Sequence, residues 1–226
     1  ENINSVEAEV IKYRIYEKSL TLVANDKVLP IIDLKGESFG SISLGSDKIT
    51  PFQKRIWSYV NSENYYLPKS AKSNDYKIKS SQLSRKDYVI ISLHNMSTSA
   101  RNKYGLNGQQ LRLISELSKN TKVILVVFGS PYSLKYFENI PCLLQAYEED
   151  EIVQDLAAQA IFGAIDITGK LPVTASEKFP YSHGIILPSI KRLGFSIPER
   201  VGLNSDTLLQ IRELMLEMIA EKAAPG

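Results

Sequence analysis

Polar side chains follow three apolar runs of the sequence, and their types suit hydrogen bonding to a polar ligand. His94 and Asn95 come directly after "DYVIISL", Ser130 lies two residues after "VILVVF", and Glu148 and Glu149 follow "PCLLQAY". Imidazole, amide, hydroxyl and carboxylate groups together can bind the hydroxyls of a sugar. We therefore predict these five residues as candidates for a substrate cleft.

Each candidate also has a structural interpretation that needs no ligand. His94 could instead satisfy a backbone group of its own loop, and the two roles carry equal weight. The acidic run "EED" precedes a helical pattern, and capping that helix is the favoured interpretation. A carboxylate pair for glycoside cleavage needs a defined separation in space, which neighbouring positions in the sequence do not establish.

The candidates need a scaffold that brings strand ends together, and the sequence predicts one. The three apolar runs have the length of strands without polar alternation, and helical patterns separate them. This alternation is typical of a parallel sheet covered on both sides. We predict an α/β fold with a doubly wound, mainly parallel sheet flanked by helices, as in flavodoxin-like three-layer sandwiches. Such sheets bind ligands at the carboxyl ends of their strands.

Capping signals predict two helices before these runs. Residues 5–26 read as one amphipathic helix capped by Ser5. Residues 50–60 read as a helix with Thr50 as its cap and Pro51 at its first position.

Three further predictions concern segments with weaker signals. The stretch 68–86 is rich in lysine and serine, and we interpret it as a solvated surface loop rather than a basic docking patch. Gly163 is placed to end a helix in a left-handed conformation, and Gly169 to supply a second turn. Pro172 lacks an amide donor, so 170–176 is predicted as an edge strand or the approach to one.

The composition excludes several classes of function. The net charge of +2 gives no electrostatic drive toward nucleic acid. One cysteine, Cys142, rules out internal disulfides and cysteine-rich metal sites, and two histidines rule out a histidine-rich one. Phosphate-binding glycine motifs and nucleophile motifs are absent from the sequence, and its apolar runs are too short to cross a bilayer. We predict no cofactor, no metal, no nucleic-acid partner and no membrane span.

Two stretches resemble a known family. The segment "AEVIKYRIYEKSLTLVANDKVLPI" is similar to the entry into the C-terminal α/β domain of glycoside hydrolase family 3. The run from "VILVVFGS" to "GKLPVTAS" resembles the most recognisable part of that domain, and the likeness extends over residues 5–189. In this family an N-terminal (β/α)8 barrel carries the substrate site and the aspartate nucleophile. The resemblance implies that such a barrel belongs to the same polypeptide, outside this sequence.

The sequence departs from one pattern of the family. Many glucosidase members have a general-acid glutamate after a strand similar to "DYVIISLHN". Here His94 and Asn95 follow, and no glutamate occurs through Asn107. The departure favours the β-N-acetylhexosaminidase branch, whose general acid lies on the barrel.

The resemblance therefore implies an accessory domain with no catalytic residue of its own. It would pack beside the barrel of an enzyme that hydrolyses terminal β-linked amino sugars, with carbohydrate at the domain interface. The alternative is a stand-alone doubly wound module that binds a small ligand or a partner.

The tail carries a separate resemblance. The stretch "RLGFSIPERVGLNSDTLLQIRELMLEMIAEKAAPG" is similar to the entry into a serine β-lactamase-like domain. We predict the family 3 domain over 1–189, a linker over 190–203, and the first helix of a truncated β-lactamase-like domain over 204–226. The chain would then be the middle of a longer polypeptide, and such fusions imply a bacterial periplasm or cell envelope.

Overall fold

The computed structural model describes residues 5–223 of the chain. The chain divides into two compact units, one formed by residues 15–193 and the other by its two ends, up to residue 14 and from residue 194. The predicted domains at 1–189 and 204–226 include terminal residues, among them the final "APG", that lie outside the described residues.

The larger unit is built on one six-stranded sheet in the order β1-β6-β5-β4-β2-β3. All neighbouring strands are parallel except β1, which runs antiparallel to β6. The strands are β1 Thr21–Asn25, β2 Phe39–Leu44, β3 Ser62–Leu67, β4 Tyr88–Leu93, β5 Lys122–Val127 and β6 Cys142–Gln145.

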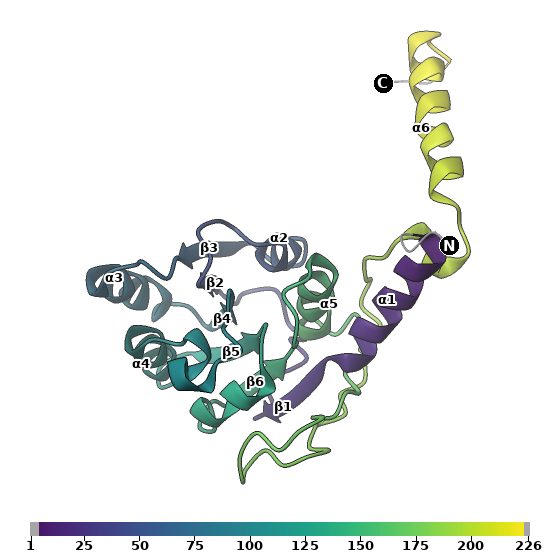
Figure 1. The fold of residues 1–226 in the computed structure, drawn as a ribbon. Helices are drawn as coiled ribbons and strands as arrows, with labels where there is room; N and C mark the ends of the chain where they lie inside the picture. Colours follow the sequence, from purple (N-terminus) through teal and green to yellow (C-terminus); the bar gives the residue numbers. More distant parts are fainter. Residues whose placement is uncertain (1–4, 224–226) are drawn as a thin grey trace. The chain divides into compact units, whose positions relative to one another are not determined.

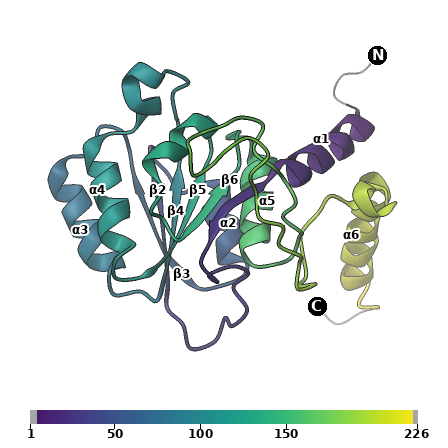
Figure 2. The ribbon, with the colours of Figure 1, turned by 90° about the horizontal axis from the view of Figure 1, so that it is seen from below.

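Helices cover both faces of this sheet, as the fold prediction requires (Figure 1). Helices α3 and α4 lie on one face and α2 and α5 on the other, and the three layers are clear in Figure 2. The α-helices are α1 Val6–Ser19, α2 Pro51–Trp57, α3 Ser73–Leu83, α4 Gly108–Leu117, α5 Glu151–Ile161 and α6 Ser205–Ala220. The shorter 3-10 helices are η1 Ala100–Gly105, η2 Pro131–Tyr136 and η3 Pro198–Val201. The predicted α/β three-layer fold is confirmed.

The two faces of the central strands differ in chemistry. On β2, Ile42 and Leu44 join the apolar cluster beneath α3 and α4, and equivalent alternate positions of β4 and β5 do the same. The intervening Ser41 and Ser43 point to the α2 side, where the side chains of Gln53 and Thr50 contact them. Alternation across the pleat therefore separates an apolar face from a partly polar one.

Local capping forms α2 as predicted. The Thr50 side chain accepts a hydrogen bond from the Gln53 amide at 3.3 Å, and Gln53 Oε1 accepts one from the Thr50 amide at 3.2 Å. This reciprocal capping box, with Pro51 at the first position, fixes the start of the helix.

The helix predicted over 5–26 is too long. Helix α1 ends at Ser19, and Thr21–Asn25 forms strand β1 instead. Leu20 and Leu22 are fully buried, and β1 pairs with β6. Pairing with a strand more than a hundred residues away outweighs the local helical spacing here.

The surface loop predicted over 68–86 is also wrong, because residues 73–83 form α3. Tyr76 and Leu83, two turns apart, are buried in the apolar cluster, and the Asp75 carboxylate caps the helix by accepting from the Lys72 amide at 2.8 Å. The lysines and serines occupy the outer face of an amphipathic helix.

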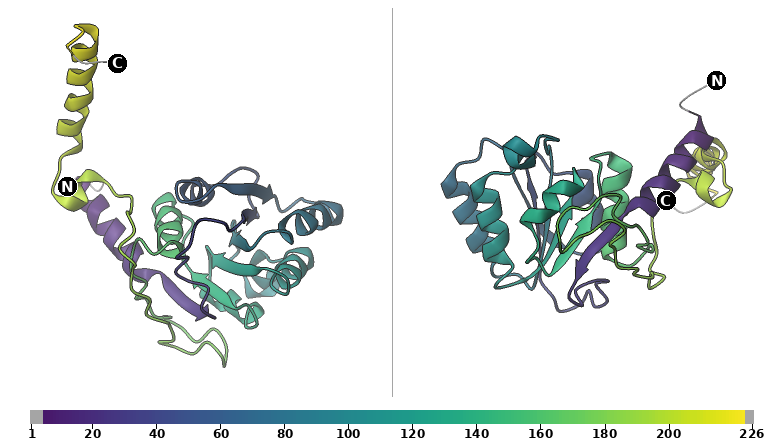
Figure 3. Two further views of the ribbon diagram at one scale, coloured as in Figure 1. Left: turned by 180° about the vertical axis from the view of Figure 1, so that it is seen from behind. Right: turned by 60° about the horizontal axis from the view of Figure 1, so that its bottom comes forward.

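The segment after α5 returns beside β1 (Figure 3). Gly163 has a φ of +72°, which confirms the predicted left-handed helix end. Residues 170–176 form no strand, so that prediction is wrong. Instead the Leu171 and His183 backbones pair, with the Leu171 amide 2.8 Å from the His183 oxygen.

Gly169 owes its place to close packing rather than to a second turn. A Cβ there would lie 2.5 Å from the carbonyl oxygens of Ser19 and Leu20, where β1 begins. The motif "GKLPVT" therefore fixes this returning segment against the first strand, and the structure gives it an architectural role.

The ends of the chain form the second unit. Ser5 Oγ accepts from the Ala8 amide at 3.2 Å, which confirms the predicted cap of α1. Asn204 caps α6 by accepting from the Thr207 amide at 2.9 Å. Helix α6 has no buried residue. Five large apolar side chains of this helix are exposed: Leu208, Ile211, Met215, Met218 and Ile219.

Candidate functional site

A cavity of about 360 Å³ opens at the carboxyl ends of β4, β5 and β6. Three of the five predicted cleft residues, Ser130, Glu148 and Glu149, line it. The loops after all three strands contribute to its wall, and the complete lining is Met96, Ser97, Thr98, Phe128, Gly129, Ser130, Pro131, Tyr147, Glu148 and Glu149. The parallel sheet thus brings the candidates together at the edge where such folds bind ligands.

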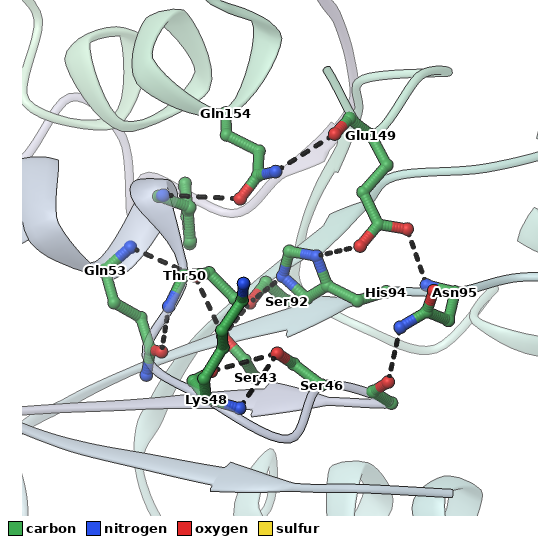
Figure 4. A network of polar contacts seen from close by, with 12 residues as sticks. Ser43, Ser46, Lys48, Thr50, Gln53, Ser92, His94, Asn95, Glu149 and Gln154 are labelled. Carbon is green, nitrogen blue, oxygen red and sulfur yellow. Dashed lines mark hydrogen bonds and ion pairs between the residues drawn. The ribbon is translucent and has the colours of Figure 1, made fainter. Parts of the chain in front are cut away.

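Glu149 is held in place by two hydrogen bonds from the β4 strand end. Its Oε1 lies 3.0 Å from His94 Nδ1, and its Oε2 accepts from the Asn95 amide at 2.6 Å (Figure 4). Burial by itself would raise the pKa of Glu149, but the hydrogen bonds from His94 and Asn95 lower it below its ordinary value. Glu149 is thus an ionised, oriented carboxylate at the cavity wall.

His94 lies beneath the cavity and not in its lining. Its residue exposure is 2%, and its ring stacks on Phe128 with centroids 5.0 Å apart. Both ring nitrogens have side-chain partners, because Nε2 lies 2.9 Å from Ser92 Oγ. The ring nitrogens of His94 therefore contact two side chains, and not the loop backbone group that the structural interpretation expected.

Ser92, His94 and Glu149 stand in the order serine, histidine, carboxylate that activates nucleophiles in hydrolases. Ser92 is 1% exposed, however, and its hydroxyl also contacts Ser43 Oγ at 2.9 Å across the sheet. A substrate carbonyl or anomeric carbon cannot reach this oxygen. The hydrogen bonds among these three residues hold the strand ends together, and they provide no reactive centre.

The polar contacts continue from Ser92 toward helix α2 (Figure 4). Ser43 Oγ lies 3.2 Å from Thr50 Oγ1, and Thr50 accepts from the Gln53 amide. We call the series Glu149, His94, Ser92, Ser43 and Thr50 the hydroxyl chain. It runs inside the layer between the sheet and α2, with its four inner members buried.

The remaining polar candidates have distinct roles. Asn95 adopts a left-handed φ of 51°, and its side chain donates to the Gly45 carbonyl at 2.8 Å. Asp150 caps α5 by accepting from the Ile152 amide, so the capping interpretation of the acidic run is confirmed for this residue alone. The exposed Glu148 carboxylate has no hydrogen-bond or ion-pair partner among the described residues.

Tyr147 also lines the cavity. Its backbone φ of 66° is left-handed, and its hydroxyl lies 2.8 Å from Thr21 Oγ1. Burial raises the pKa of Tyr147, while the hydrogen bond with Thr21 acts in the opposite direction. The phenol therefore stays neutral near pH 7 and ties the β6 end to β1.

Sequence reasoning missed the hydroxyl chain. The available signal was the set of polar residues inside otherwise apolar strands, Ser41 and Ser43 in β2 and Ser92 in β4. Alternation places them on one face, but which groups they meet depends on the packing of α2 and of the β6 loop.

The described residues contain no group of three or more side chains suited to holding a metal ion. Within residues 5–223, no helix combines the length and apolarity needed to cross a bilayer.

Comparison with known proteins gives one family. The family described as "Glycosyl hydrolase family 3 C-terminal domain" matches residues 20–183. No curated protein matches the sequence.

Several solved structures share the fold. A glycoside hydrolase family 3 β-N-acetylglucosaminidase from Paenibacillus sp. str. FPU-7 is 16% identical with a TM-score of 0.61, over 76% of this chain and 33% of that chain. A β-glucosidase, EmGH1, from Erythrobacter marinus is 16% identical with a TM-score of 0.61, over 81% of this chain and 35% of that one. A fungal multi-domain family 3 β-N-acetylglucosaminidase is 19% identical with a TM-score of 0.59, over 85% and 20% of the two chains. The present chain thus spans between 20% and 35% of these proteins.

Proposed function

The chain belongs to the glycosyl hydrolase family 3 C-terminal domain family, and from that premise we propose that it is the accessory, non-catalytic α/β domain of a longer glycoside hydrolase. A (β/α)8 barrel elsewhere in the same polypeptide would cleave the bond, with retention through a covalent intermediate. The substrate class proposed is a terminal β-linked amino sugar, as in a β-N-acetylhexosaminidase.

The observation that carries this proposal is a cavity equipped to bind but not to cleave. It offers the free carboxylate of Glu148, the hydroxyl of Ser130 and the oriented carboxylate of Glu149. Glycoside cleavage needs one carboxyl group as acid and a second as nucleophile or base at a defined separation. Both oxygens of Glu149 are engaged within the chain, and the loop over 96–107 contains no carboxylate.

We place this cavity at the wall of the substrate cleft, where carbohydrate would lie between the domain and the barrel. Ser130, Glu148 and Glu149 would contact sugar hydroxyls there. Asn95 and His94 would support them from below, because their contacts hold Glu149 in place.

Sugar binding can be tested on this chain directly. Titration with N-acetylglucosamine, followed by amide NMR shifts, should perturb the 129–131 and 147–149 loops, and Glu148→Gln should weaken that response. Glu177→Gln is the matched control, because Glu177 is an exposed glutamate whose side chain has no hydrogen bond or ion pair within the described residues. Equal responses from both variants would remove Glu148 from the site.

Catalysis is tested separately. The purified chain should not hydrolyse an aryl β-N-acetylglucosaminide. Turnover that is lost when a residue of this chain is substituted would contradict the accessory role.

A stand-alone binding module is the second candidate, and the same cavity favours it. Gene context separates the two: an accessory domain requires a segment that encodes a barrel upstream of Glu1. A module that acts alone has no such neighbour.

We further propose that the family 3 domain ends near residue 189, that 190–203 is a linker, and that 204–226 begins a serine β-lactamase-like domain. The absence of any buried residue in α6 supports this division. A fusion of this kind would belong to the bacterial periplasm or envelope. Deletion of the chain from residue 204 should leave the thermal midpoint of the larger unit unchanged, and a lower midpoint would place α6 within the family 3 domain.

A further inference from the structure

The hydroxyl chain has only one proton arrangement that satisfies all its members, and this determines the state of His94. An ionised carboxylate only accepts hydrogen bonds, so the contact at 3.0 Å between Glu149 and His94 requires a proton on Nδ1. The lowered pKa of Glu149 means that this carboxylate is ionised at neutral pH.

Whether Nε2 carries a proton follows from counting the protons of the neighbouring hydroxyls. If Nε2 accepts, Ser92 donates to it, Ser43 donates to Ser92, and Thr50 donates to Ser43. Each hydroxyl then gives one proton and receives one, because Thr50 itself accepts from the Gln53 amide. The helix α2 backbone thus starts a series of donors that all point toward Glu149.

The opposite arrangement leaves a group unsatisfied. If Nε2 carried a proton, it would donate to Ser92, and the hydroxyls of Ser92 and Ser43 would have to turn toward Thr50. Thr50 Oγ1 would then receive from both Ser43 and the Gln53 amide, and its own proton would have no acceptor within the described structure. A buried hydroxyl whose proton has no acceptor is destabilising.

We infer that His94 is a positioning residue, fixed by the hydroxyl chain as the neutral Nδ1–H tautomer, and that it sets the orientation of the Glu149 carboxylate at the cavity wall. A role of His94 in sugar binding rests on the proposed function, but its tautomer and its hydrogen bond with Glu149 do not. Ser92, Ser43 and Thr50 act through His94 and never meet a ligand.

His183 supplies an internal comparison. Its Nε2 lies 2.7 Å from the Val23 carbonyl oxygen, which only accepts, so this ring must carry a proton on Nε2. The chain has two histidines. One spectrum should therefore contain two rings that differ in which nitrogen is protonated.

The first experiment is a long-range proton–nitrogen NMR correlation at pH 7 on the intact chain with ¹⁵N-labelled histidine. The His94 ring should show a protonated Nδ1 and a bare Nε2, and the His183 ring should show a proton on Nε2. His183→Phe assigns the two sets of signals. A His94 ring that is protonated on Nε2, alone or together with Nδ1, would overturn the inference.

The second experiment follows Glu149 by titrating its side-chain carboxyl carbon. His94→Phe keeps an aromatic ring against Phe128 but removes the donor, so the pKa of Glu149 should rise. His94→Asn, whose amide can occupy the place of Nδ1, should restore part of the lower value, and His183→Phe should leave the titration unchanged. An unchanged Glu149 titration in a folded His94→Phe would contradict the positioning role.

Neither experiment needs a sugar, so its outcome is separate from that of the N-acetylglucosamine titration. If the variants do not fold, the tautomer measurement on the wild-type chain still tests whether His94 is the Nδ1–H form.

Discussion

The two faces of the sheet use the same strands in different ways. Toward α3 and α4, β2, β4 and β5 present only aliphatic side chains, including Ile42, Ile91 and Leu125. Toward α2, the alternate positions of β2 and β4 include Ser43, Ser92 and the strand-end His94.

The difference teaches that one face mainly stabilises the fold, whereas the other mainly positions side chains. Aliphatic side chains stabilise the fold in proportion to the area they bury, and they accept many exchanges of similar volume. Buried hydroxyls and an imidazole contribute less net free energy, but each needs particular partners at hydrogen-bonding distance. The apolar face holds the sheet together, and the polar face determines where Glu149 lies.

The largest effect should come from the apolar face. Leu125 is fully buried, and Leu125→Ala should lower the free energy of unfolding by about 3 kcal/mol because it opens a cavity. Chemical denaturation measures this. Ile186→Ala, at a residue that is 64% exposed, is the control and should change the free energy of unfolding by less than about 0.5 kcal/mol. A similar cost for both variants would contradict the assignment of the core.

An intermediate effect is expected on the polar face. Ser43→Ala should cost about 1–2 kcal/mol, because it leaves Ser92 without its donor and Thr50 without its acceptor. In a double-mutant cycle, Ser43→Ala and Ser92→Ala should be non-additive by about 1 kcal/mol. Ser115→Ala on the exposed side of α4 is the control. Additive costs would mean that the hydroxyls act independently.

The smallest effect concerns pH. The pKa of Glu149 is lowered in the folded chain, so its contribution to stability is fully present above its unfolded pKa, about 4.3, and is lost as the pH falls through the folded value. The difference in unfolding free energy between wild type and Glu149→Gln should therefore shrink as the pH falls below about 4.3. Glu177→Gln controls for the loss of a surface charge. A difference that grows on acidification would reverse the sign of the argument.

Several features of the fold were predictable because their causes are local. The apolar runs that became β4, β5 and β6 are continuous, and the cap at Thr50 and the left-handed Gly163 need only neighbouring residues. Helix α3 escaped prediction because its two buried residues, Tyr76 and Leu83, stand among lysines and serines. Two apolar side chains at helical spacing were too few to outweigh that composition.

The candidate site was predictable only in location. The rule that ligands meet the carboxyl ends of parallel strands predicted that Ser130, Glu148 and Glu149 would lie close together, and all three line one cavity. The same rule could not distinguish the accessible Glu148 from the engaged Glu149, nor place His94 beneath the cavity.

The sequence by itself determined the α/β class, the three central strands and the place of the cavity, because hydrophobic periodicity and turn residues act over a few positions. Only the tertiary structure decided that residues 21–25 join the sheet and that His94 meets Glu149, 55 residues away. A hydrogen bond between distant segments forms only when its two atoms lie within a few tenths of an ångström of the preferred separation, and the packing of the layers sets that separation.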